Sequence, residues 1–331
     1  MKSPLRKRLP RELKGEIGKY LVVLILMIAT IGFVSGFLVA DGSMIKAYNE
    51  GFEKYKIEDG NFRVKKKITK AQQENIEKNG VTLYENFYLE EALDTGSTMR
   101  IFKNREEINL VCLMEGKLPE KAGEMAIDRM YADNNELSVG DIITEEEGRR
   151  EWKITGLVAL SDYSCLFSDN NDSMLDAVKF GVGIVTEEAF DTFNTDNMTC
   201  NYSWKYGKEP KGETEEKNVA EDFMKVLNNE VSLETFVPRY SNQAIQFTGE
   251  DMGSDRMMMI ILLYIVIAIL AFVFGITISN TIHKESTVIG TLRASGYTRR
   301  ELILHYMTAP MLVTFAGAVV GNILGYTVLK N

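Results

Sequence analysis

Residue types that commonly do chemistry in enzymes are few in this chain and lie far apart. The only histidines are His283 and His305, and the only cysteines are Cys112, Cys165 and Cys200. The sequence contains no CxxC or HExxH motif and no G-x-x-x-x-G-K-[ST] phosphate-binding loop. Zinc sites, histidine-based triads and ATP-binding loops depend on such spacings. The sequence therefore predicts no catalytic residue, no metal site and no cofactor-binding site in this chain.

Charged residues that could bind a partner gather in one short segment, residues 283–301. It holds the basic residues Lys284, Arg293, Arg299 and Arg300 and the acidic residues Glu285 and Glu301. The pattern predicts an amphipathic helix over 285–293 and a turn at Gly296. A capping box, Thr298 with Glu301, then predicts the start of the next helix. Such a basic elbow can bind a cytoplasmic partner, or it can simply anchor the chain at the lipid headgroups.

Three long runs without charged residues must position this elbow. Residues 20–40 carry no charge, and 17 of these 21 residues are apolar. Residues 257–283 and 302–329 also contain no Lys, Arg, Asp or Glu. Because a helix needs about 20 apolar residues to cross a bilayer, we expect transmembrane helices at 20–40, 257–282 and 302–329. The first run is longer than the apolar part of a signal peptide, so we expect an uncleaved anchor.

The distribution of Lys and Arg predicts the orientation of these helices. Residues 1–19 carry seven basic and two acidic residues, so this lead-in and the elbow should stay in the cytoplasm. Residues 41–256, with 26 basic and 43 acidic residues, should then lie outside the cell or in the periplasm. The mean hydropathy of −0.11 and the net charge of −9 average over these unlike parts. We expect a multi-pass plasma-membrane protein that contacts lipid and does not bind nucleic acid.

Glycine spacing is the main signal inside the predicted spans, which contain no ionisable Asp, Glu, Lys or Arg. The absence of such charges argues against an ion or proton pathway. Gly32 and Gly36 form one GxxxG pair, and Gly317, Gly321 and Gly325 form two in series. Small residues at this spacing let helices approach closely, so we expect helix packing at these glycines. The alternative is that glycine is simply common in membrane helices.

Residues 41–256 are long enough for one large domain or two small lobes. A helical stalk is expected over 42–55, and a capping box at Thr69 and Gln72 predicts a helix to about residue 78. Strands are expected at 61–68, 81–89, 99–102, 108–113, 180–185 and 231–237, and a hairpin is expected in which 142–147 pairs with 152–160. Helices are expected at 129–134, at 187–193 with Thr186 as its cap, at 218–228 and from 241 onward, with a mobile loop at 207–217. This alternation predicts an α+β domain inserted between the first and second transmembrane helices.

The three cysteines all lie in this predicted outer domain, so at most one pair can form a disulfide. Cys165 and Cys200 could be bridged. The alternative is that the cysteines are small, buried apolar residues.

The elbow resembles the signature of FtsX-like permeases. From Glu285 to Gly296 it reads E-x-x-x-I-G-x-L-R-A-x-G, and Leu302 follows at the expected distance. The segments 115–119 (EGKLP), 124–128 (EMAID) and 137–141 (LSVGD) resemble the extracytoplasmic core domain of MacB-type permeases. Residues 5–20 resemble the amphipathic lead-in of large Gram-positive members. The resemblance covers nearly the whole chain.

This resemblance implies a non-catalytic membrane subunit of a MacB/LolC/FtsX-type ABC transporter. Its partners would be a cytoplasmic ATPase, which binds ATP and Mg²⁺, and a second copy or a homologous permease. ATP-driven movements would reach the outer domain and serve export or mechanotransmission of a peptide, lipoprotein or antibiotic-type substrate. The residues matched to ATPase coupling are Glu285, Arg293, Gly296, Arg299 and Arg300.

One departure concerns the number of spans, because the family usually has a fourth helix after the third. We expect the permease module in residues 1–331 to be incomplete, as in the N-terminal portion of a longer permease or a half-protein. The alternative function is a membrane-anchored receptor or scaffold that binds a peptide or an envelope protein.

Overall fold

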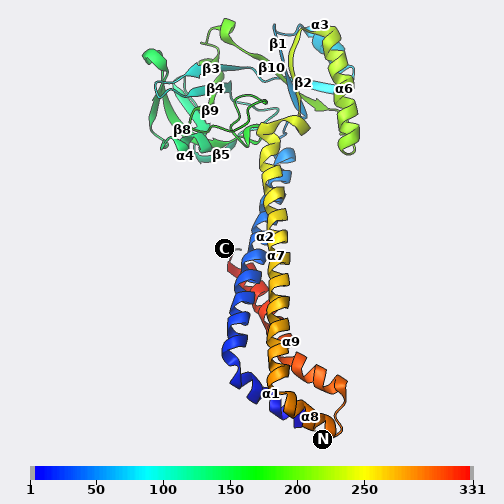
Figure 1. Ribbon diagram of the computed structural model, residues 1–331. Helices are drawn as coiled ribbons and strands as arrows, with labels where there is room; N and C mark the ends of the chain where they lie inside the picture. The colour runs from blue at the N-terminus through cyan, green and yellow to red at the C-terminus, as the bar shows by residue number, and fades with distance from the viewer. Residues whose placement is uncertain (1–3, 329–331) are drawn as a thin grey trace. The chain divides into compact units, whose positions relative to one another are not determined.

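The computed structural model describes residues 4–328, which form long apolar helices and two β-sheets (Figure 1). The chain divides into two compact units. One unit consists of Met1–Lys46 and Asp251–Asn331, and the other of Ala47–Glu250. The first unit holds the apolar runs, and the second lies within the predicted outer segment, residues 41–256. Each unit is described separately.

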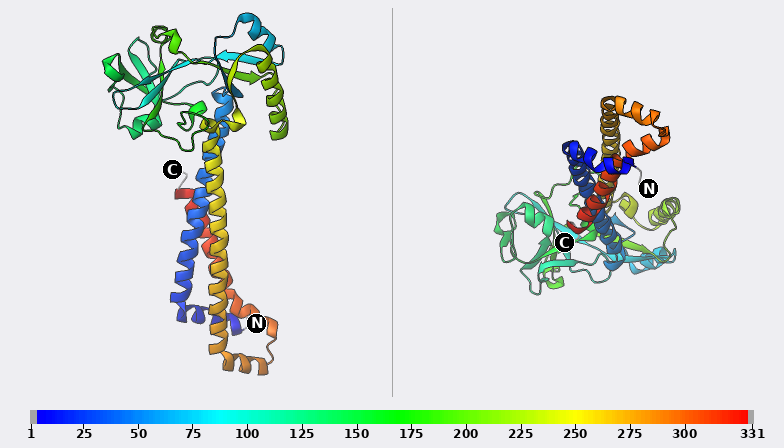
Figure 2. Two further views of the ribbon diagram at one scale, coloured as in Figure 1. Left: turned by 45° about the horizontal axis from the view of Figure 1, so that its top comes forward. Right: turned by 90° about the horizontal axis from the view of Figure 1, so that it is seen from below.

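The first unit is helical. It contains α1 (Pro4–Gly15), most of α2 (Ile17–Lys54), most of α7 (Gln243–Lys284), α8 (Ser286–Ala294) and α9 (Arg299–Val328). Among residues 4–328, α2, α7 and α9 are the helices long and apolar enough to cross a membrane. A helix suits these runs because it satisfies all its backbone hydrogen bonds within one segment. Three helices at the expected apolar runs, each a candidate to cross a membrane, are thus confirmed, and in both views of Figure 2 α9 runs alongside α2.

The second unit contains a four-stranded antiparallel sheet in the order β11-β1-β10-β2. Its strands are β1 (Gly60–Val64), β2 (Val81–Glu85), β10 (Cys200–Tyr206) and β11 (Leu233–Pro238). Helices α3 (Lys70–Glu77) and α6 (Glu213–Glu230) pack against it. Aromatic rings dominate this core: Trp204 is fully buried and stacks on Phe236, with ring centroids 4.9 Å apart. This sheet and its helices are called the four-stranded lobe below.

A seven-stranded mixed sheet forms the rest of the unit, in the order β3-β4-β9-β6-β8-β5 with β7 paired to β8. Its strands are β3 (Tyr88–Ala92), β4 (Thr98–Lys103), β5 (Cys112–Gly116), β6 (Glu124–Asp128), β7 (Ile142–Thr144), β8 (Glu151–Ala159) and β9 (Phe180–Val185). Its short helices are α4 (Arg129–Asn134) and α5 (Glu187–Phe190). Turns of 3-10 helix lie at Glu146–Gly148, Ser161–Tyr163, Thr195–Asn197 and Arg239–Ser241. Every residue of β9 is buried, as suits a central strand.

The seven-stranded lobe is an insertion in the four-stranded lobe. Strands β3 to β9 follow one another in sequence between β2 and β10, which are neighbours in the four-stranded sheet. The chain therefore joins the four-stranded lobe, and not the seven-stranded lobe, to α2 and α7. An α+β domain between the first and second apolar helices is confirmed.

Several local predictions match the structure closely. The Thr69 side chain accepts a hydrogen bond from Gln72 N, and the Gln72 side chain accepts one from Thr69 N, so the capping box is present. Thr186 caps α5 through Ala189 N. The expected hairpin is formed by β7 and β8, which pair in antiparallel orientation.

Other local predictions were wrong. The run 81–89 is two strands, because β2 and β3 belong to different sheets. The strand expected at 108–113 begins only at Cys112, and β10 was not predicted at all. Part of the loop expected at 207–217 is helical, since α6 begins at Glu213. Three glutamates in the first turn of α6 favour that start, because acidic groups stabilise the positive end of a helix.

Candidate functional site

The elbow consists of α8, a turn and the start of α9. Gly296 N donates a hydrogen bond to Arg293 O, and Tyr297 N donates one to Leu292 O, both at 3.1 Å. This pattern is a Schellman motif, which ends a helix with a left-handed residue. Gly296 has a φ of +95°, which costs a glycine nothing. The structure thus places a helix-ending turn at the predicted position.

The next helix begins with the predicted capping box. Thr298 N and Thr298 Oγ1 each lie 2.8 Å from Glu301 Oε2, and Glu301 N donates to Thr298 Oγ1 at 3.3 Å. These bonds satisfy backbone groups that have no partner within the helix. The turn between α8 and α9 is therefore held from both ends by local contacts.

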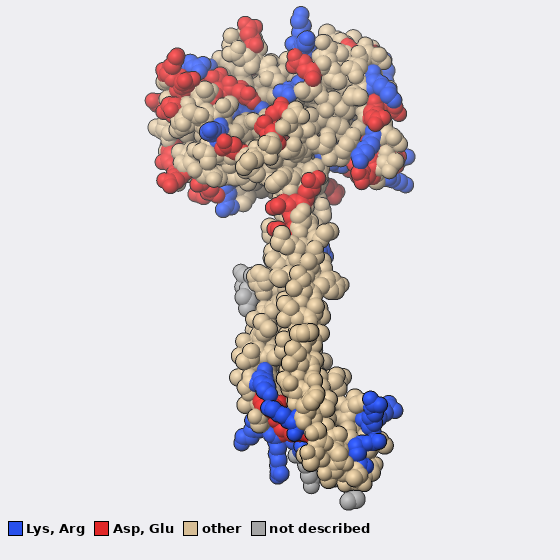
Figure 3. Space-filling model, in the orientation of Figure 1, with Lys and Arg blue, Asp and Glu red and all other residues tan. Residues whose placement is uncertain are grey.

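The arginines of the elbow are exposed. Arg293 Nη1 donates to Tyr297 O at 3.2 Å, and the side chain stays exposed. Arg299 and Arg300 are the first residues of α9, are exposed, and form no ion pair with any residue in 4–328. On the face shown in Figure 3, Lys and Arg gather at the elbow end of the helical unit. The elbow therefore presents a basic surface, beside the exposed apolar side chain of Val288.

Glu285 is placed differently from these arginines. It lies between α7 and α8, and its carboxylate is only partly exposed, at 23%. Glu285 Oε2 accepts hydrogen bonds from Arg8 Nη2 at 2.8 Å and from Tyr306 OH at 2.6 Å. The predicted coupling residue is therefore engaged inside the unit, by α1 and α9.

Further contacts join α1 to α9, and Glu16, just after α1, to α7, and sequence reasoning missed all of them. His305 Nε2 lies 3.0 Å from Glu12 Oε2, and Thr281 Oγ1 lies 3.4 Å from Glu16 Oε2. Arg8 also forms an ion pair with Glu12 on the same helix. The i,i+4 spacing of Arg8, Glu12 and Glu16 shows that they share one face of the lead-in. No sequence pattern reveals what that face contacts.

The glycines predicted for helix packing lie between α2 and α9. A Cβ atom on Gly321 would come within 2.9 Å of Ile31 Cβ and 3.3 Å of Gly32 N. A Cβ atom on Gly325 would lie 2.9 Å from Gly36 N, and one on Gly317 would lie 3.0 Å from Met27 Cβ. Larger residues do not fit at these distances, so the backbones can approach only because the side chains are absent.

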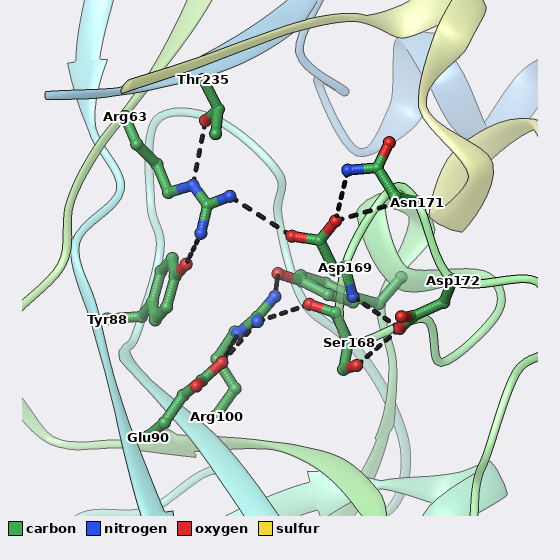
Figure 4. A network of polar contacts seen from close by, with 10 residues as sticks. Arg63, Tyr88, Glu90, Arg100, Ser168, Asp169, Asn171, Asp172 and Thr235 are labelled. Atoms are coloured by element: carbon green, nitrogen blue, oxygen red, sulfur yellow. Dashed lines mark hydrogen bonds and ion pairs between the residues drawn. The ribbon is translucent and has the colours of Figure 1, made fainter. Parts of the chain in front are cut away.

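A polar network joins the two lobes of the second unit (Figure 4). Arg63 on β1 donates to Thr235 Oγ1 at 2.9 Å and reaches Asp169 Oδ2 of the other lobe at 3.4 Å. Arg100 on β4 is buried, pairs with Glu90 and donates to Ser168 O at 2.7 Å. The cavity beside these groups measures about 70 Å³, room for a few water molecules. The network suits the joining of lobes better than the binding of a substrate.

One contact fastens the seven-stranded lobe just after the end of α2. Glu58 N donates to Asn109 Oδ1 at 2.9 Å, and Asn109 Nδ2 donates to Glu58 Oε2 at 2.8 Å. Asn109 is fully buried and has a left-handed φ of +49°, which asparagine tolerates better than most residues. Burial, together with the nearby Asp162 carboxylate, raises the pKa of Glu58, while hydrogen bonds from Ser203, Asn61 and Asn109 oppose the rise.

A second contact fastens the same lobe to the start of α7. Gln243 N and Gln243 Nε2 each donate to Asn170, to its Oδ1 and its carbonyl oxygen, at 2.8 Å. Ser164 Oγ donates to Ala244 O at 2.8 Å. The inserted lobe therefore contacts both chain segments that lead to the apolar helices, although the chain connects it to neither directly.

One cysteine takes part in the contact with the start of α7: Cys165 N donates a hydrogen bond to Ala244 O at 3.1 Å, and Cys165 Sγ lies 3.3 Å from Thr248 Oγ1. Within residues 4–328, no disulfide forms, and no group of three or more His, Cys, Asp or Glu could hold a metal ion. The bridge considered for Cys165 and Cys200 is thus absent from the structure. Cys165 is buried, as the alternative interpretation expected.

Comparison with curated proteins finds a relative that is similar over about two thirds of this chain. A curated relative is the "Putative hemin transport system permease protein HrtB" of Staphylococcus haemolyticus (strain JCSC1435), which is 27% identical over 220 residues. That match covers 66% of this chain and 52% of the relative, so the chain spans about half the length of the relative.

Two solved structures show weak overall similarity to this chain at 11% identity. One is the periplasmic region of MacB from Actinobacillus actinomycetemcomitans, with a TM-score of 0.33, covering 58% of this chain and 91% of that one. The other is the extracellular domain of the noncanonic ABC-type transporter YknZ from Gram-positive bacteria, with a TM-score of 0.28, covering 53% and 98%.

The family match falls on the part of the chain that carries the elbow. Residues 260–330 match the family described as FtsX-like permease C-terminal. They include the larger part of α7 and all of α8 and α9. The resemblance expected from the elbow is confirmed, because residues 260–330 match the FtsX-like permease family.

Proposed function

We propose that this chain is the non-catalytic permease subunit of an ABC transporter. A separate cytoplasmic ATPase binds ATP and Mg²⁺, and its movements reach the outer domain through this chain. The observation that carries the proposal is the exposed basic elbow inside an FtsX-like permease domain. The name of the relative HrtB, a permease of a hemin transport system, supports the same class.

The elbow is the surface that contacts the ATPase in this proposal. Arg293, Arg299 and Arg300 donate hydrogen bonds to acidic groups of the partner, and complementary charge speeds and orients the encounter. Val288, exposed on α8, adds an apolar contact. Gly296 permits the tight turn that presents both helices. Placing the elbow and residues 1–19 in the cytoplasm follows from their excess of Lys and Arg.

Transmission through the helices, rather than a polar pathway between them, fits the composition of the spans. Helices α2 and α7 each continue without interruption from an apolar run into Ala47–Glu250. The chain segments at their outer ends contact the seven-stranded lobe through Asn109 and Asn170. Displacement of either helix end would therefore shift that lobe, because hydrogen-bonded elements move together or break their bonds.

Further partners follow from the apolar surface of α7. Only 6% of its most apolar window is buried within the chain. A second permease copy or a homologous permease would cover part of this apolar surface. Lipid would cover the rest. Candidate substrates are peptides, lipoproteins and antibiotics, to which the name of HrtB adds hemin.

Charge reversal in the elbow tests this proposal. The double variant Arg299→Glu/Arg300→Glu should weaken co-purification with the partner ABC ATPase by about tenfold or more, a loss of ~1.4 kcal/mol or more. The reason is that two favourable contacts become repulsive at an acidic surface. Binding of the purified proteins in lipid nanodiscs gives the measurement.

Arg129→Glu, an exposed charge reversal on α4, is the matched control and should leave binding unchanged. Equal binding by wild type and the elbow variant would remove the elbow from the interface. Ligand binding by the outer domain without any associated ATPase would favour the receptor alternative.

A further inference from the structure

Three elements meet at a single carboxylate oxygen in the helical unit. Glu285 Oε2 accepts a hydrogen bond from Arg8 of α1 at 2.8 Å and from Tyr306 of α9 at 2.6 Å. Arg8 and Glu285 are 277 residues apart in the sequence. A charged hydrogen bond of this kind is short and directional, so it restricts the relative positions of the elements it joins.

Glu285 occupies the point at which the chain changes direction. Its backbone has φ −99° and ψ 13°, between the end of α7 and the start of α8. Backbone bonds run across the junction, from Glu285 N to Thr281 O at 3.0 Å and from Ile289 N to Glu285 O at 2.8 Å. In both views of Figure 2 α8 leaves the end of α7 at a sharp angle. Glu285 thus connects α7 and α8, but its side chain is held by residues of two other helices, α1 and α9.

Neighbouring contacts hold α1, and Glu16 just after its end, against α9 and α7. Glu12 lies 3.0 Å from His305 of α9, and Glu16 lies 3.4 Å from Thr281 of α7. In contrast, the bond that Arg293 of α8 forms within residues 4–328 is to its own turn, through Tyr297 O. The contacts of α1 thus end at the junction, and the outer surface of α8 stays open to a partner.

We propose that Glu285 is a positioning residue, through which α1 sets the direction of α8 and hence the geometry of the elbow. This inference rests on the proposed function of the elbow as the ATPase contact. It separates two roles that the sequence pattern combines in one motif. The arginines bind the ATPase, whereas Glu285, Arg8 and Tyr306 hold the surface on which those arginines stand.

The first test needs no ATPase and uses the full chain in lipid nanodiscs. Amide hydrogen exchange should rise at least about fivefold in residues 4–16 of Glu285→Gln and Arg8→Gln, because α1 loses its attachment and opens more often. The charge swap Arg8→Glu/Glu285→Arg should recover much of the protection, since the ion pair is restored with opposite polarity. Ser286→Ala, next to Glu285 on exposed α8, is the matched control and should exchange like wild type.

The second test adds the ATPase. Glu285→Gln should bind it within about twofold of wild type, yet lose most of the stimulation of ATP turnover that the permease gives. The variant Arg299→Glu/Arg300→Glu should show the reverse, with weak binding and normal protection of α1. A purely structural role for Glu285 would lower binding and turnover together and would not produce this separation.

Two outcomes overturn the proposal. Unchanged exchange of α1 in both Glu285→Gln and Arg8→Gln would show that the carboxylate does not hold the helix. Loss of ATPase binding in Glu285→Gln with normal protection of α1 would make Glu285 a contact residue, and the proposed function would stand. If wild type binds no ATPase, the proposed function fails and the positioning role fails with it, while hydrogen exchange still decides whether Glu285 fastens α1.

Discussion

Asp128 lies between a strand and a helix, and its raised pKa should make the stability of the fold depend on pH. It is the last residue of β6, and its Oδ1 accepts hydrogen bonds from Met130 N at 2.8 Å and Tyr131 N at 3.2 Å. It therefore caps α4. Burial raises the pKa of Asp128 from 3.8 to about 6, because removal from water disfavours the charged form.

This shift predicts how stability changes with pH. Because the folded pKa is higher than the unfolded one, the folded state binds more protons between about pH 4 and pH 6. The contribution of Asp128 to the free energy of unfolding is therefore fully present below about pH 4 and is lost as the pH rises through about 6. A shift of about two units corresponds to roughly 3 kcal/mol at most. Asp128→Asn keeps a capping oxygen but should lose this part of the pH dependence.

Fluorescence during urea unfolding in detergent measures the effect, since the only tryptophans, Trp152 and Trp204, lie in β8 and β10. The difference in unfolding free energy between wild type and Asp128→Asn should change between pH 4 and 7. Asp133→Asn, at an exposed carboxylate of α4, serves as the control. Equal pH slopes for wild type and Asp128→Asn would contradict the prediction.

At the level of elements, the packing of α2 against α9 depends on the glycine stripe. Gly317, Gly321 and Gly325 are buried, whereas residues on other faces of α9, such as Phe315 and Ile323, are exposed. Close backbone contact is the main source of attraction between apolar helices in a membrane, because lipid removes the hydrophobic driving force. A bulky residue in the stripe must push the helices apart.

Gly321→Leu should therefore destabilise the helical unit by about 1–3 kcal/mol, the usual cost of overpacking. The thermal unfolding midpoint in detergent, followed by light scattering, should fall. Ala316→Leu adds the same side chain on an exposed face of α9 and should leave the midpoint unchanged. A similar midpoint for both variants would favour the view that these glycines merely reflect membrane composition.

Local sequence signals identified most elements, and their failures have physical causes. Caps at Thr69, Thr186 and Thr298 were recognised because a cap involves residues only three positions apart. Strand β10 alternates Tyr202, Trp204 and Tyr206 with polar residues. This alternation is typical of a strand and could have predicted β10. The break within 81–89 could not be predicted locally. It arises because β2 pairs with β10, which is distant in the sequence, whereas β3 joins the other sheet.

Across the whole molecule, acidic charge is concentrated in the inserted lobe. Residues 86–199 contain 24 acidic and 10 basic residues, a balance of −14 out of the −17 carried by residues 41–256. The elbow and residues 1–19 are basic. Such a separation favours one orientation in a membrane, because Lys and Arg are retained on the cytoplasmic side.

Orientation can be tested with two introduced cysteines in a chain whose native cysteines are replaced. No disulfide is lost by that replacement in the described residues. A membrane-impermeant maleimide on intact cells should label Met174→Cys, at a position 79% exposed in the seven-stranded lobe, and should not label Ser295→Cys in the elbow. Permeabilised cells should label both. The reverse pattern on intact cells would invert the proposed topology.

The sequence by itself determined the three apolar helices, the caps and turn of the elbow, and the α+β character of the outer segment. These features depend on residues close together in the sequence, so composition and spacing are enough to predict them. Only the tertiary structure decided that one lobe is inserted in the other and that Arg8 holds Glu285. Such contacts depend on where distant segments meet in space, and no local pattern carries that information.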